Sequence, residues 1–251
     1  MFRVAVAVVA SLISLQVLAQ EPPAALHMAT VYIDELAAEH DIQQQAEVQA
    51  KTTGHNQNQS LMDSVRSTTS LQLSLAQAVN ALALINGPPK LLQTRDLLMK
   101  TYAYKGEVLD DVKKTAQTFI AGAYKQDPSV NYGELAARAP ENTARITDIN
   151  DTLFKLGTLV FGGMVDMRAD KDGHVSHLTI TQTQRKNLLD QINSRFGRSL
   201  DGKDMSITDQ GAWLLRSQLS KPFTHESVTL VTNVAASFVV GYPAVHEARR
   251  T

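Results

Sequence analysis

Apolar side chains recur at helical spacing through the middle of the chain, and this pattern constrains the fold more than any other. Successive members of the series lie 4, 7, 3, 4, 3 and 4 residues apart, which places them on one face of an α-helix. A cofactor box or a free coiled-coil dimer is the lesser alternative, because the seam is short for a coiled coil. We therefore expect this stripe to be buried in a helical bundle. Its members are Leu98, Tyr102, Leu109, Val112, Ala116, Phe119 and Ala123.

The rest of the chain divides into further helical segments separated by turn sequences. Asn86-Gly87-Pro88-Pro89 predicts a sharp stop followed by a helix start. Thr181-Gln182-Thr183-Gln184 fits the capping box Thr-x-x-Gln, which predicts another helix start. We expect Pro140 to end a short helical turn over 132–139. The longer helices are expected over 25–51, 60–85, the seam segment up to 125, 141–168, 181–197, 207–220 and 224–241.

This pattern predicts an all-α fold, a bundle of about six to seven helices with at most a minor extended segment near 175–180. The length allows one large domain or two small ones. A soft boundary near 170–177 would separate a long-helix bundle over 20–169 from a compact helical part over 170–251. One continuous domain over 20–251 is the alternative.

The first nineteen residues have the layout of a secretory signal peptide. Arg3 precedes an apolar run from Val4 to Leu18, and Val17-Leu18-Ala19 places small or medium residues before a cut. A membrane anchor is the alternative, but the run is shorter than the roughly 20 residues that a bilayer span needs. We expect cleavage after Ala19, removal of 1–19, and a periplasmic or secreted protein with no integral membrane segment left.

Composition narrows the functional classes. The formal net charge is −1, which gives no electrostatic case for nucleic-acid binding. The 43% hydrophobic and 20% charged content is ordinary for a globular protein. Because the chain has no cysteine, it forms no disulfide, offers no catalytic thiolate and holds no cysteine-ligated metal. Its stability must come from helix packing.

One turn partly matches a calcium-binding loop. Asp170 and Asp172 occupy loop positions 3 and 5, a glycine follows at the sharp-turn position, and His174 can offer a backbone carbonyl. Arg168 stands at position 1, and Thr179 stands at position 12 where a bidentate glutamate belongs. An ordinary polar turn therefore explains the sequence better than a metal site. Asp170, Asp172 and His174 are the metal-ligand candidates, and calcium is the one cofactor considered.

Two other motifs are incomplete. His225-Glu226-Ser227-Val228-Thr229 begins like H-E-x-x-H, but Thr229 replaces the second histidine that would bind zinc. The segment 197–204 resembles a phosphate-binding loop, but Asp204 replaces the hydroxyl that would hold magnesium. We expect neither to be a site.

Three functions follow from these observations. The first is a non-catalytic exported protein of adaptor, immunity or chaperone type that binds another envelope protein. The second is a small-ligand or divalent-metal-binding protein, and the third is a cell-envelope hydrolase, which only the location supports. Aromatic residues are enriched at binding hot spots. The candidates are Tyr102, Tyr104, Tyr124, Tyr132 and Trp213, with core packing expected for Tyr102 and Trp213.

Overall fold

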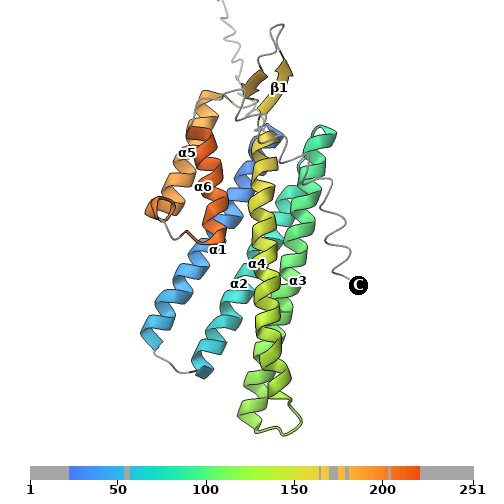
Figure 1. Ribbon diagram of the computed structural model, residues 1–251, viewed down its shortest axis with the longest axis vertical. Coiled ribbons are helices and arrows are strands. Elements are labelled where there is room, and N and C mark those ends of the chain that lie inside the picture. The colour runs from blue at the N-terminus through green and yellow to red at the C-terminus, as the bar shows by residue number, and fades with distance from the viewer. Residues whose placement is uncertain are drawn as a thin grey trace, which may run out of the picture.

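The protein is an all-α bundle, as the computed structural model shows (Figure 1). The structure describes residues 23–53, 57–163, 165–169, 175–178, 181–202 and 205–220. Four long helices run along the molecule, and two shorter ones lie beside them. The elements are α1 (Ala24–Thr53), α2 (Gln57–Ala83), α3 (Pro89–Lys125), α4 (Tyr132–Gly163), β1 (Val165–Ala169), β2 (Val175–Leu178), α5 (Gln182–Phe196), the 3₁₀ helix η1 (Gly197–Asp201) and α6 (Ile207–Ser220).

Local sequence accounts for several helix ends. Pro88 has an extended backbone (φ −60°, ψ 153°) and Pro89 is the first residue of α3. Gln126 ends α3 in the left-handed region (φ 50°), and its N–H points to the carbonyls of Ala123 and Gly122. At α5, the Thr181 side chain accepts from the Gln184 N–H, and the Gln184 side chain accepts from the Thr181 N–H, so the predicted capping box is confirmed.

The two shorter helices complete one side of the bundle. The α6 helix packs on α4 and α1, and α5 packs on α6 and α1. The Arg185 side chain donates to the Leu219 carbonyl at 2.6 Å, which ties the start of α5 to the end of α6. Among the described helices, none combines the length and apolar content that crossing a bilayer requires.

A single cluster of buried side chains draws on all six α-helices. The cluster includes Tyr32, Leu82, Leu98, Leu156, Ile192 and Leu215. The predicted α3 stripe belongs to it at Leu98, Tyr102 and Leu109. The cluster does not extend further toward the turn between α3 and α4, residues 126–131, which we call the turn end of the bundle. The candidate site lies where this cluster ends.

The expected break at Pro140 is wrong. The α4 helix runs without interruption from Tyr132 to Gly163 with Pro140 inside it. A proline removes one helical hydrogen bond, in this case to the Ala136 carbonyl. Ala136 and Pro140 are both exposed, so water can hydrogen-bond the carbonyl that loses its partner.

The expected continuation of this helix to 168 is also wrong. Residues 165–169 form β1, which pairs antiparallel with β2, and Val165 stands opposite Leu178. Gly162 and Gly163 end α4, and the apolar residues Val165, Met167 and Ala169 then alternate with polar ones as in a strand. The predicted extended segment near 175–180 coincides with β2. The helix expected over 224–241 lies outside the described residues, and the proposed boundary near 170–177 stays a prediction.

Candidate functional site

An apolar groove opens at the turn end, where the buried core stops. It has a volume of about 460 Å³ and lies between α2, α3 and α4. Val112, Ala116 and Phe119 continue the predicted α3 stripe along its floor. The facing walls come from Leu61 of α2 and from Leu135, Ala139 and Ile146 of α4.

The groove exists because α4 offers little bulk in its first half. Within residues 132–147, all of which the structure describes, Asn142 is the one buried side chain. Ala136 and Ala139 line the groove, and their side chains are too short to fill the space against α3. The stripe prediction is therefore confirmed at Leu98, Tyr102, Leu109 and Ala116, but it is wrong for Val112 and Phe119, which are half-buried, and for Ala123, which is exposed.

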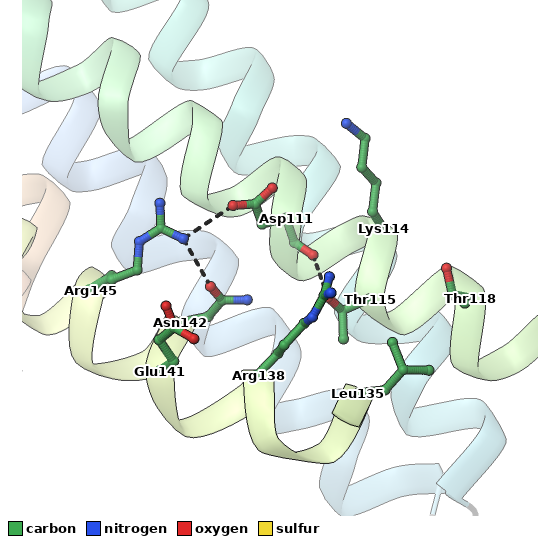
Figure 2. Close-up of a pocket in the computed structure, with 9 residues that line it drawn as sticks. All are labelled: Asp111, Lys114, Thr115, Thr118, Leu135, Arg138, Glu141, Asn142 and Arg145. Carbon is green, nitrogen blue, oxygen red and sulfur yellow. Dashed lines mark hydrogen bonds and ion pairs between the residues drawn. The ribbon is translucent and has the colours of Figure 1, made fainter. Parts of the chain in front are cut away.

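A polar pocket of about 320 Å³ adjoins this groove between α3 and α4 (Figure 2). Thr115, Leu135 and Asn142 line both the pocket and the groove, so an apolar surface and a charged surface meet at one place. The remaining pocket residues are Asp111, Lys114, Thr118, Arg138, Glu141 and Arg145.

Arg145 is held in a fixed position on the pocket wall. Its Nη1 lies 3.1 Å from Asp111 Oδ2 and 3.3 Å from Asn142 Oδ1, as Figure 2 shows. The guanidinium carbon lies 5.7 Å from the Tyr104 ring centroid, within the range of a cation–π contact. A hydrogen bond with Tyr104 raises the pKa of Arg145 further above its ordinary value. The guanidinium is therefore a permanent, oriented positive charge.

Arg138 is more accessible than Arg145. Its side chain is 55% exposed and pairs with Glu134, one turn back on the same helix, at 2.8 Å. An exposed pair of this kind contributes little to stability, so the guanidinium can exchange Glu134 for another anion at small cost. Lys114, on the opposite wall, pairs with Asp110 at 2.6 Å in a similar exposed contact.

The predicted aromatic residues differ in how deeply they are buried. Tyr102 is fully buried, as expected. Trp213 is 39% exposed, so its expected core position is wrong. The buried stripe of α6 runs through Thr208, Ala212, Leu215 and Leu219. Trp213 follows Ala212 by one residue and therefore points about 100° away from that stripe.

The three tyrosines near or beyond the groove are not equivalent. Tyr132 packs edge-on against Phe119, with ring centroids 5.3 Å apart, and so supports one end of the groove. Tyr104 is half-buried under Arg145, whereas Tyr124 is 89% exposed near the end of α3.

The predicted metal ligands are not placed. Asp170, Asp172 and His174 lie outside the described residues. Within the described part of the chain, no group of three or more His, Asp or Glu side chains is arranged to hold a metal ion. The metal hypothesis therefore stays a sequence-based prediction.

Comparisons with protein-family models, with curated proteins and with solved structures found no match to this chain. The groove, Arg138 and Arg145 were not predicted from the sequence. The available signal was the run of alanines that faces a regular apolar stripe, because short side chains opposite an apolar face leave space between two helices.

Proposed function

We propose that this protein is an exported, non-catalytic binding protein that holds a helix of another envelope protein in the α2–α3–α4 groove. One observation carries the proposal. The α3 face that packs the core at Leu98 and Leu109 continues through Val112, Ala116 and Phe119 along the groove. An amphipathic helix binds in such a groove by inserting apolar side chains at matching intervals.

The adjoining polar pocket supports a protein helix as the ligand. A helix seated in the groove brings its flanking polar residues over Arg138 and Lys114, which are exposed. Charges at the rim of an interface mainly set orientation, association rate and choice of partner, while apolar burial supplies most of the affinity. The groove supplies the apolar surface, and the pocket supplies the charges at its rim.

The signal-peptide pattern of residues 1–19 supports an envelope partner. Export would bring the protein to the same compartment as its ligand. The proposal assigns no reaction to the groove, and its lining side chains are suited to burying apolar surface.

Cross-linking from a defined position tests the proposal. A photoreactive amino acid replaces Phe119 in the groove or, as the control, Leu73, which is exposed on α2 outside the groove. We expect a protein partner to be cross-linked from position 119 and not from position 73. The partner is then purified and its binding to the purified protein is measured.

Two tryptophan variants separate groove binding from other contacts. Ala139→Trp fills the groove, whereas Ala137→Trp places the same side chain on an exposed part of α4 that does not line it. We expect Ala139→Trp to weaken binding at least about 10-fold, equivalent to roughly 1.4 kcal/mol, and Ala137→Trp to leave it nearly unchanged. Equal effects of the two variants would overturn the proposal. Cross-links from position 119 only to a second copy or to another segment of the same chain would do so too.

A further inference from the structure

Three ionisable side chains are buried together where α1 meets α3. Glu35 is 2% exposed, Glu39 is 3% exposed and Lys105 is 1% exposed. Glu35 and Glu39 are four residues apart on α1, so both point from the same face of that helix. Lys105 comes from α3.

The carboxyl groups of Glu35 and Glu39 differ in the partners that they have. Lys105 Nζ lies 2.5 Å from Glu39 Oε2, which makes a close buried ion pair. Both carboxyl oxygens of Glu35 are inaccessible to water and have no hydrogen-bond partner in the described part of the chain. The hydroxyl of Tyr102, also buried, has none either.

The protonation state of Glu35 sets the net charge of this buried cluster. Lys105 and Glu39 neutralise each other, so an ionised Glu35 adds one uncompensated negative charge to a site that is closed to bulk solvent. Such a charge is costly, and a buried carboxyl group avoids the cost by staying protonated. Burial raises the pKa of Glu35 to about 7, with Lys105 opposing this rise and Glu39 adding to it. The proton is therefore exchanged near neutral pH.

Among the described residues, Lys105 is the cation that acts electrostatically on Glu35. From α1 and α3 the cluster receives Tyr32 and Tyr102, and burial raises the pKa of both, so they stay neutral. Tyr32 donates to the Leu153 carbonyl of α4 at 2.8 Å. On the α6 side, Asp209 is engaged by His40 Nδ1 at 2.8 Å. Lys105, the cation whose charge acts on Glu35, is already paired with Glu39.

The contact between α1 and α3 is narrow. The α1 helix packs extensively on α2 and also on α4, α5 and α6, but it touches α3 over a short stretch that includes this cluster. Glu35 and Glu39 both belong to α1, and Lys105 of α3 attracts them, so the cost of ionising Glu35 comes mainly from its missing hydration. Opening a narrow contact admits water to the carboxylate without dismantling the rest of the core.

We propose that Glu35, Glu39 and Lys105 form a proton-dependent latch: while Glu35 holds its proton α1 stays packed on α3, and loss of the proton moves α1 away from α3. The latch goes beyond the proposed function, since it uses none of the groove residues. Its ligand is the proton, and its moving part is α1.

Distance measurement between two spin labels tests the latch. The chain has no native cysteine, so Gln45→Cys on α1 and Glu107→Cys on α3, both exposed, can be labelled specifically. We expect one short distance at about pH 5.5 and a second, longer distance at about pH 8.5, with a midpoint near the titration of Glu35. Glu35→Gln, which mimics the protonated side chain, should keep the short distance at both pH values.

Glu47→Gln is the matched control, because Glu47 is exposed on the same helix. It should respond to pH as the unsubstituted protein does. A distance that does not change with pH in the unsubstituted protein overturns the latch, and so does an unchanged pH response in Glu35→Gln. If Glu35→Gln does not fold, the side-chain carboxyl carbon of Glu35 is titrated by NMR in the unsubstituted protein. Titration between about pH 6 and 8 supports the latch, and titration below about pH 5 overturns it.

Discussion

At the scale of single residues, Lys105 occupies a position that few lysines tolerate. Its ammonium group is buried against Glu39 and neutralises a carboxylate that water cannot reach. Removing one partner of a buried ion pair leaves the other as an uncompensated charge, which typically costs about 3–5 kcal/mol. The two partners of this pair are not equivalent, however, because Glu35 lies beside them.

We predict that Lys105→Met lowers the free energy of unfolding by about 3–5 kcal/mol at neutral pH, and that Glu39→Gln lowers it by less. In Glu39→Gln, the carboxyl group of Glu35 can ionise and pair with Lys105 in place of Glu39. Urea denaturation measures both losses. Lys155→Met, which breaks an exposed pair with Asp151, is the control and should cost less than about 1 kcal/mol. Equal losses for Lys105→Met and Glu39→Gln would contradict this account.

Glu35 also makes stability depend on pH. Its pKa is about 7 in the folded protein against an ordinary value of 4.5, so the folded state binds more protons between these values. Stability is then greatest at low pH within this range and falls as the pH rises. The difference in pKa corresponds to roughly 3 kcal/mol. Asp110, whose pKa a hydrogen bond from Lys114 lowers to about 2, titrates below this window.

We predict that the free energy of unfolding decreases as the pH rises from about 5 to about 7, and that Glu35→Gln removes most of this decrease. Urea denaturation across the pH series measures it. The variant Glu47→Gln should retain the decrease, because Glu47 is exposed. A free energy of unfolding that rises with pH through this range would contradict the raised pKa of Glu35.

At the scale of elements, two glycines let α4 and α6 close around Tyr32. A Cβ atom on Gly211 of α6 would lie 2.5 Å from the Tyr32 hydroxyl oxygen and 2.9 Å from Leu36 Cδ1. A Cβ atom on Gly157 of α4 would lie 2.9 Å from the same hydroxyl oxygen. Because Tyr32 donates to the Leu153 carbonyl, its ring cannot withdraw without losing that hydrogen bond.

We predict that Gly211→Ala lowers the free energy of unfolding by about 1–3 kcal/mol through overpacking. Gly106 in α3 provides the contrast, since a Cβ there meets no atom of the described residues within 4 Å. Gly106→Ala should raise the stability by about 0.5–1 kcal/mol, because alanine restricts the unfolded chain and favours the helix. Thermal denaturation of the two variants should therefore shift in opposite directions. Equal shifts would mean that Tyr32 does not require glycine on α6.

Local signals predicted some elements well and others poorly. The prolines at 88 and 89 and the capping box at Thr181 act within a few residues, and both helix starts were predicted correctly. Pro140 was misjudged because its cost depends on whether water reaches the Ala136 carbonyl, which only the packed structure decides. The strand β1 was missed because it depends on pairing with β2 further along the chain.

At the scale of the whole molecule, the sequence predicted a buried stripe but not where burial ends. Leu109 and Phe119 belong to the same periodic face, yet Leu109 is buried and Phe119, in the groove, is half-buried. Periodicity identifies the face of a helix that packs. The extent of packing depends on the bulk that α2 and α4 present at each level, and α4 presents alanines near the turn end.

This uneven packing predicts an uneven local stability along a single helix. Amides over 149–160 of α4 lie against the core, whereas those over 135–147 border the groove and pocket. Local opening is easier where few apolar contacts are broken. We predict that hydrogen exchange is at least about 10-fold faster over 135–147 than over 149–160, although both belong to one continuous helix.

Hydrogen-exchange mass spectrometry of the free protein measures this ratio, and α3 supplies an internal control. Its core-facing part around Leu98 should exchange slowly, while its part around Phe119 should exchange as fast as the facing part of α4. A helix of a partner protein seated in the groove would slow exchange in both fast segments together, because it buries Val112, Phe119 and Leu135 at once. Uniform protection along α4 in the free protein would show that the turn end is packed as tightly as the core, and the groove would then not be available to a partner.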